Sequence, residues 1–288
     1  MNKYYLFFLT VGMCIFTIAG FSQRFPVHNS LKYLNLTGEV KSVTTYKQKF
    51  TKEGKKKKVN ADSASFASRM ELDLMGLPVL MQYSRGMDLI EDVNTYDPDG
   101  NLIRQDYTGD YSNDFSLFSY DTINNIVDMY VFGTPTFNSD TIAQRVEQYD
   151  ENMNLVHYEM LMCPNNEWRH WEVRLIEYDS LGRETKKKVY NGKSTLHSTS
   201  TFTYDADKNI KLEHTIYEDK NTPVSPKKKY KYDDRENVVE EIWMKENGDV
   251  SEANTFKYKY DKQGNWTEKR HYRNDELVEV SFRAIEYY

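Results

Sequence analysis

The chain has 288 residues, of which 39% are apolar, 28% are charged and 14% are aromatic, with 23 tyrosines. Its formal charge of -6 gives no electrostatic reason to expect nucleic acid or an anionic membrane surface as a partner. The tyrosine-rich composition favours strands over packed helices, because aromatic side chains suit a half-buried pleated surface.

The first 22 residues differ in composition from the rest of the chain. Lys3 precedes an apolar run over residues 4–21, which ends in small residues. This pattern predicts a signal peptide over residues 1–22, cleaved between Ser22 and Gln23, and therefore a secreted, periplasmic or cell-surface protein. One alternative is an uncleaved segment that anchors the protein in a membrane. Lipidation at Cys14 is another.

Cleavage of this segment would leave one cysteine, Cys163, in residues 23–288. No intramolecular disulfide is then expected, although the compartment would permit one. Loss of Lys3 would change the formal charge from -6 to -7. We expect residues 23–288 to form a single domain held by packing and by hydrogen bonds between strands.

A repeat runs through most of the chain. The dipeptide Tyr-Asp occurs seven times, at spacings of 24, 29, 29, 26, 28 and 28 residues. The residue before each tyrosine is polar, the fifth residue after it is Asn in six copies, and the sixth is apolar in six copies. The tyrosines are Tyr96, Tyr120, Tyr149, Tyr178, Tyr204, Tyr232 and Tyr260. An earlier copy over residues 73–77 keeps the Asp and the Gly but lacks the Tyr.

Each position of the repeat has a physical interpretation. A tyrosine after a polar neighbour is typical of a strand with one buried face. The aspartate can begin a turn by accepting hydrogen bonds from backbone amides that follow it. Gly100, Gly182 and Gly264 occupy the fourth position after the tyrosine, and Gly and the following Asn both tolerate positive φ. Further turn signals lie 12 to 19 residues past each tyrosine. Every repeat is therefore predicted to contain two strands and two turns.

Stacked hairpins of this kind predict an all-β fold, in which tandem β-hairpin repeats form one continuous coiled antiparallel sheet. We expect about fifteen strands, each of roughly six to ten residues, with the tyrosines lining one inner face. The best repeats span 71–266, and closing strands follow over 267–288. The twelfth residue after each tyrosine is apolar in six of seven copies and is predicted to face the same core. Polar residues at positions eight to ten suggest either a bulge or a strand that is solvated on both faces.

The ends of such a sheet need protection from edge pairing. A closing strand over Val278–Tyr288 could provide it by packing across the array. The cations Lys55–Lys58 could also do so, although a solvated loop is the simpler interpretation of that segment.

The motif and its spacings resemble the YD-repeat (Rhs-type) family over about residues 71–266. The resemblance implies a β-sheet that spirals, and a sugar-binding or cell-surface role. The chain is far shorter than the members of that family that build closed shells, and its strands run to the last residue, so encapsulation is not expected. Leu36–Val43 and Ile285–Tyr288 resemble the opening and final strands of small secreted members.

The sequence offers no pattern for catalysis. It contains no HExxH, GxSxG, P-loop or dinucleotide-binding glycine motif. Its six histidines show no metal-ligand spacing, and no pair among its many carboxylates can be singled out. We therefore predict a protein that is not an enzyme, with no catalytic residue, metal or cofactor.

The candidate binding residues are Trp168, Trp171 and Trp243, which lie outside the repeat positions. Exposed indoles can stack on sugar rings, whereas packing across the sheet is the alternative for each of them. Trp266 occupies the apolar position of its repeat and is expected in the core. The predicted function is non-enzymatic binding of a glycan or a cell-envelope protein.

Three alternatives to this function follow from the same sequence. The chain could be a purely structural surface or periplasmic module, or a glycan-acting hydrolase with convergent carboxylates in a pocket. An outer-membrane barrel is disfavoured by segments such as Lys228–Lys231, which would place cations against lipid.

Overall fold

The computed structural model describes residues 36–50, 64–85, 88–109, 113–133, 141–163, 167–206, 210–219 and 227–288. The predicted signal peptide over residues 1–22 and the cations Lys55–Lys58 lie outside these ranges.

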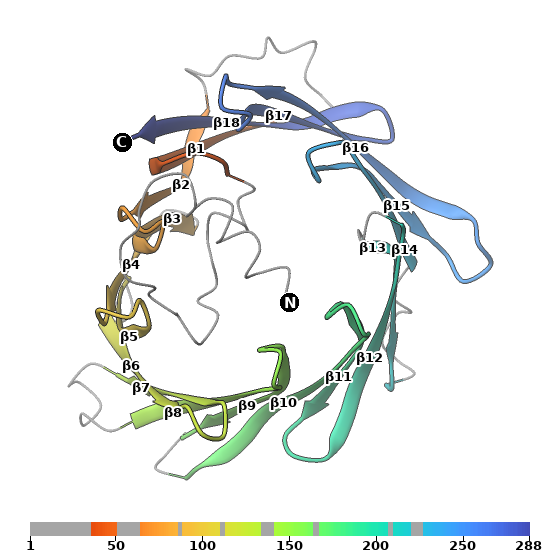
Figure 1. Cartoon of the computed structure of the whole chain (residues 1–288). Coiled ribbons are helices and arrows are strands. Elements are labelled where there is room, and N and C mark those ends of the chain that lie inside the picture. Colours follow the sequence, from red (N-terminus) through yellow and green to blue (C-terminus); the bar gives the residue numbers. More distant parts are fainter. Residues whose placement is uncertain are drawn as a thin grey trace.

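The described part of the chain is all-β, and its strands form a closed antiparallel barrel (Figure 1). Each strand pairs with the next along the chain, and β18 pairs with β1, so the barrel has no free edge. The strands are β1 Val40–Lys49, β2 Ser65–Leu72, β3 Pro78–Arg85, β4 Asp88–Tyr96, β5 Leu102–Thr108, β6 Asn113–Asp121, β7 Ile126–Phe132, β8 Thr141–Tyr149, β9 Leu155–Met162, β10 Arg169–Tyr178, β11 Glu184–Asn191, β12 Thr195–Tyr204, β13 Ile210–Tyr217, β14 Lys227–Tyr232, β15 Val238–Met244, β16 Val250–Tyr260, β17 Trp266–Arg273 and β18 Glu276–Tyr287.

The prediction of one continuous antiparallel sheet is confirmed, but two of its details are wrong. The sheet has 18 strands rather than fifteen, because β1 to β3 precede the first Tyr-Asp copy. It also closes on itself, since the closing strand β18 pairs edge to edge with β1 instead of packing across the array.

The Asp of the repeat begins a turn, as its side-chain chemistry predicts. In six copies the backbone amide four residues after the aspartate donates to its Oδ1 over 2.8–3.0 Å. The aspartates are Asp73, Asp97, Asp150, Asp179, Asp233 and Asp261. The segment over residues 73–77, which lacks the tyrosine, therefore folds as a true copy of the turn.

Positive φ falls mainly on the fourth residue after the tyrosine, not on the asparagine that follows it. Gly100, Gly182 and Gly264 adopt φ of +81°, +71° and +91°. Two copies without glycine still adopt this conformation, at Met153 (φ 61°) and Glu236 (φ 62°). A three-residue hairpin loop that ends in a left-handed residue explains the shared geometry, and the two non-glycine residues are strained within it.

A recurrent β-bulge follows each of these turns and inverts the side-chain alternation. In the first full repeat, Tyr96 lies opposite Leu102 and Thr95 lies opposite Arg104, so Ile103 is the extra residue. Positions six and eight after the tyrosine then point to opposite faces. The equivalent extra residues in the other copies are Val79, Val156, Thr185, Lys211, Val239 and Thr267.

This inversion corrects one sequence prediction. The residue twelve positions after the tyrosine lies on the face opposite the tyrosines, and Ile216 at this position is 52% exposed. A bulge was predicted at positions eight to ten, but it lies at position seven. A single inserted residue is enough to shift every later side chain to the other face.

The seven tyrosines share one face of the sheet, which we call the tyrosine face. Cross-strand pairs connect it continuously, for example from Glu147 through Tyr158 to Arg174. Most buried polar side chains of the strands belong to it, whereas exposed Leu117 and Leu175 belong to the other face. Side chains converge on the concave side of a closed sheet and diverge on its convex side, so the tyrosine face is the inner one.

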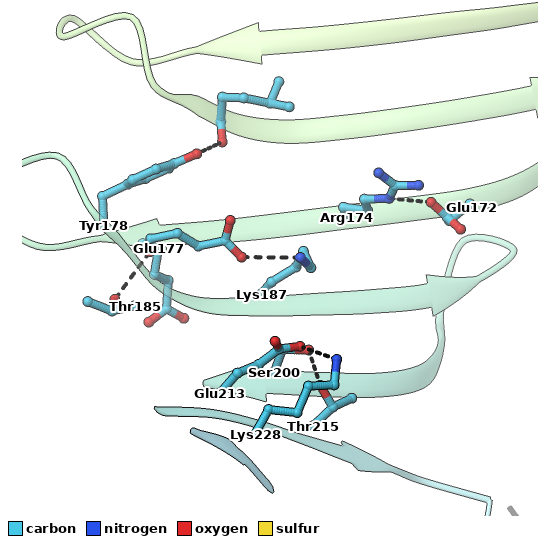
Figure 2. A network of polar contacts seen from close by, with 12 residues as sticks. Glu172, Arg174, Glu177, Tyr178, Thr185, Lys187, Ser200, Glu213, Thr215 and Lys228 are labelled. Carbon is cyan, nitrogen blue, oxygen red and sulfur yellow. Dashed lines mark hydrogen bonds and ion pairs between the residues drawn. The ribbon is translucent and has the colours of Figure 1, made fainter. Parts of the chain in front are cut away.

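Several of the tyrosines join neighbouring repeats through their hydroxyl groups. Four of them donate to the backbone carbonyl beside the bulge on the preceding strand, over 2.5–2.8 Å: Tyr96 to Pro78, Tyr120 to Leu102, Tyr178 to Leu155 and Tyr204 to Glu184. Figure 2 shows the Tyr178 hydroxyl reaching across to the neighbouring strand. The bulge interrupts the regular ladder at this point, and the phenol supplies the carbonyl with a donor.

The most buried apolar cluster lies where the two ends of the chain meet. Leu36, Val40, Val43 and Leu72 pack together there, with Ile285 against them. A second buried cluster, formed by Val127 and Tyr149 with Phe118 against them, lies over β6 to β8. The tyrosine face also contains charged pairs such as Lys228 and Glu213 (Figure 2). We call the closure between β1 and β18 the seam.

Candidate functional site

Trp168 and Trp171 are exposed at one rim of the barrel. Trp171 is the extra residue of a bulge near the start of β10, and Trp168 immediately precedes that strand. Their exposed fractions are 47% and 65%. These two exposed indoles, three residues apart, form a candidate contact surface.

The neighbours of these two indoles are polar. Arg169, between them in sequence, donates to Glu167 over 2.6 Å, and both of these side chains are exposed. The His170 imidazole contacts the Glu159 carboxylate of β9 on the outer face of the sheet, an ion pair when the imidazole is protonated. The rim therefore combines aromatic surface with donors and acceptors, a combination that suits a ligand with both polar and apolar parts.

Trp243 does not join this surface. It lies on the tyrosine face of β15, which β11 to β14 separate from β10. Its ring is half-buried, with the Lys228 ammonium 5.9 Å from the ring centroid. Within the described ranges, its indole N–H has no hydrogen-bond partner. Trp266 is 9% exposed, so its predicted place in the core is confirmed.

A pocket of about 260 Å³ opens on the tyrosine face beside the seam. Its walls come from β1, β16, β17 and β18, and therefore from both ends of the chain. Lys47, Lys269 and Arg283 contribute three cations, whereas Glu279 contributes one carboxylate. The sequence did not reveal this site, because only closure of the barrel brings β1 beside β18.

Aromatic rings hold the cations of the pocket in place. The Arg283 guanidinium lies 3.5 Å from the centroid of Trp266. The Lys269 ammonium lies 4.4 Å from the centroid of Phe256, which stacks on His271. Burial lowers the pKa of Arg283 to about 10, so this group stays charged at neutral pH. Such contacts fix cations without neutralising them.

The pKa of Lys269 is also lowered, first by burial and then by the charges of Lys47 and Arg283. Glu279 and Glu241 act in the opposite direction with smaller effects. The cations of the pocket thus repel one another, and an anion in the pocket would relieve that repulsion.

The rest of the described structure offers no metal cluster and no membrane-spanning helix. In the ranges given above, no group of three or more His, Cys, Asp or Glu side chains is placed to hold a metal ion. No helix of these ranges has the length and apolar character needed to cross a bilayer. Cys163 is half-buried at the end of β9.

Comparison with known proteins identifies no family. No protein-family model matches the chain, and no curated protein matches it. Among solved structures, it is similar to a porin-like protein from Bacteroides uniformis, with a TM-score of 0.46 and 8% identity over 87% of this chain and 98% of that one.

Two further solved structures are similar at lower scores. A protein of unknown function from Bacteroides fragilis gives a TM-score of 0.30 and 11% identity over 45% of this chain and 92% of its own. A β-barrel-like protein of a domain of unknown function from Brucella abortus gives a TM-score of 0.22 and 10% identity over 88% of this chain and 99% of its own. With TM-scores below 0.5, none of these similarities supports an inference about the function of this chain.

Proposed function

We propose that this chain is a non-enzymatic glycan-binding protein of the bacterial cell envelope or exterior, and a small member of the YD-repeat family. The exposed pair Trp168 and Trp171 carries the proposal for binding. The repeated turn geometry supports the family, because six copies share the same aspartate-to-amide hydrogen bond. The apolar segment over residues 4–21 supports export.

A glycan suits this rim better than a purely apolar ligand. Sugar rings present C–H surfaces that pack on indoles, and their hydroxyls need donors and acceptors nearby. Arg169, Glu167 and His170 provide such groups beside the two indoles.

Binding is also favoured over glycan hydrolysis by the composition of the pocket. Glycoside hydrolysis generally requires two carboxyl groups facing each other across the scissile bond. The wall of the pocket at the seam contains a single carboxylate, Glu279, which lies 3.5 Å from the Lys47 ammonium. That arrangement suits charge pairing rather than acid–base catalysis.

The test is a glycan array probed with the purified protein and with a Trp168→Ala/Trp171→Ala variant. The proposal expects saturable binding to an envelope glycan, weakened about tenfold or more by the double substitution, with an unchanged melting temperature. Trp243→Phe is the matched control, because it alters an indole away from the rim. No binding by the wild-type protein, or equal binding by the double variant, would refute the proposed function.

A further inference from the structure

The pocket at the seam is independent of the tryptophan rim. Figure 1 places β17 and β18 across the barrel from β10, and the pocket opens on the inner face while Trp171 is exposed at the rim. A function assigned to the pocket can therefore be tested without reference to the indoles.

Positive charge is the main feature of the pocket. Lys47 has a partial partner in Glu279, at 3.5 Å. For Lys269 the described residues provide two aromatic rings, Phe256 at 4.4 Å and Tyr258 at 5.8 Å, but no ion pair. A half-buried ammonium held among rings and near other cations is costly to keep charged. An incoming oxyanion would form charge-assisted hydrogen bonds with it, which are stronger than neutral ones.

The neutral groups of the wall point to a hydroxyl-rich ligand. Thr45 and Ser281 present hydroxyl groups beside the cations, and Ser281 already bonds to Glu279 over 3.2 Å. Alternating donors and acceptors of this kind match the hydroxyls of a sugar. The volume of about 260 Å³ lies below the usual range for drug-sized ligands, so one ring fits and a long oligomer does not.

We propose that this pocket binds a single sugar ring that carries an oxyanion, either a carboxylate or a phosphate. The oxyanion lies against Lys269, and the hydroxyls of the ring face Thr45 and Ser281. Because the walls come from β1 and from β16 to β18, the bound sugar also joins the two ends of the chain.

The experiment is isothermal titration of the purified protein with glucuronate, glucose 6-phosphate, glucose and inorganic phosphate. We expect saturable binding of at least one of the two charged sugars, with glucose and inorganic phosphate each about tenfold weaker or more. Lys269→Met removes the charge of the side chain but keeps most of its length, and it should weaken that binding about tenfold or more.

Lys257→Met is the matched control, because Lys257 projects from β16 on the opposite face of the sheet. It should leave binding unchanged, and melting curves should show both variants folded. Failure of both charged sugars to bind would overturn the proposal, as would equal binding by Lys269→Met. Equal binding of inorganic phosphate would overturn the assignment of a sugar. None of these results depends on Trp168 or Trp171, so they test the sugar pocket separately from the proposed glycan binding at the rim.

Discussion

Replacement of Asn265 should destabilise the barrel at its seam. This side chain is 0% exposed and lies in the last Tyr-Asp turn. Its Nδ2 donates to the Thr37 carbonyl and to the Tyr287 hydroxyl, both over 2.7 Å, and its Oδ1 accepts from the Thr37 amide over 2.6 Å. One amide group therefore holds the opening segment, the closing strand and the final turn together.

The cost of Asn265→Ala follows from these contacts. Each net hydrogen bond contributes about 1 kcal/mol, and a buried donor or acceptor left without a partner costs about 1–3 kcal/mol. Three lost bonds at a fully buried position should lower the free energy of unfolding by about 3–4 kcal/mol. Asn101, at the same position of the first Tyr-Asp repeat, is half-buried, and its Nδ2 donates to Asp97 within its own turn. Asn101→Ala should therefore cost about 1 kcal/mol.

Urea unfolding of both variants, followed by circular dichroism, measures this difference. The account expects a clearly lower midpoint for Asn265→Ala than for Asn101→Ala, with similar slopes. Equal losses for the two variants would mean that position five of the repeat acts only within its local turn, and that the seam does not depend on Asn265.

Three further outcomes follow from the turns and the tyrosine face. Glu236→Gly should stabilise the protein by about 0.5–1 kcal/mol, because Glu236 is exposed and glycine adopts its φ of 62° without strain. An unchanged melting temperature would contradict the presence of strain at this position. Tyr204→Ala should lower the free energy of unfolding by about 2–3 kcal/mol, because packing and a hydroxyl donor are lost. Lys231→Ala should be nearly neutral in the same thermal melts, because the Lys231 side chain is 62% exposed. Equal effects of the two substitutions would contradict the assignment of faces. The Arg183 side chain donates a hydrogen bond to Asp179 and holds the pKa of the Asp179 carboxyl below its usual value of 3.8. This contact should therefore stabilise the fold at neutral pH and lose its effect as the pH falls below about 4. Arg183→Ala should then differ less from wild type at pH 2.5 than at pH 7, while the contact of the guanidinium with the Tyr204 ring, at 4.5 Å, is lost at both pH values. An equal difference at both pH values would exclude the ion pair as the cause.

The local features of the fold could be predicted from sequence because they depend on neighbouring residues. The turn at Asp97 requires only an aspartate, a residue that tolerates positive φ and the intervening backbone. The common face of the tyrosines was predicted from the polar residue that precedes each of them. Even the copy at Asp73, without its tyrosine, was visible in the sequence and has the same turn.

Two other features could not be predicted because they depend on register and on distant segments. The extra residue at Ile103 has no distinctive side chain, yet it reverses the face of every residue that follows in β5. Closure depends on the pairing of β1 with β18, which no spacing within the repeat encodes. The pocket beside the seam, including Lys47 and Arg283, was missed for the same reason. Reading the parity of β16 to β18 after a bulge at position seven would have placed Lys269 on the inner face.

The three candidate tryptophans differ in how exposed their side chains are, and the sequence alone did not determine this exposure. Trp168 and Trp171 lie beside a turn and at a bulge, where side chains are not covered by cross-strand neighbours. Trp243 also lies beside a register shift, between β15 and β16, yet its side chain is half-buried on the tyrosine face. A bulge alone therefore does not determine the exposure of an aromatic side chain in this repeat.

Closure of the sheet can be tested with a disulfide across the seam. Thr44 of β1 lies opposite Ala284 of β18, at the spacing that facing residues of antiparallel strands adopt and that a disulfide accepts. Thr44→Cys/Ala284→Cys should be prepared with Cys14 and Cys163 changed to serine. The account predicts an intramolecular disulfide with altered mobility on a non-reducing gel. A control pair of cysteines at Thr44 and at Thr199 of distant β12 should give free thiols or intermolecular dimers. The same result for the pair across the seam would contradict a closed barrel.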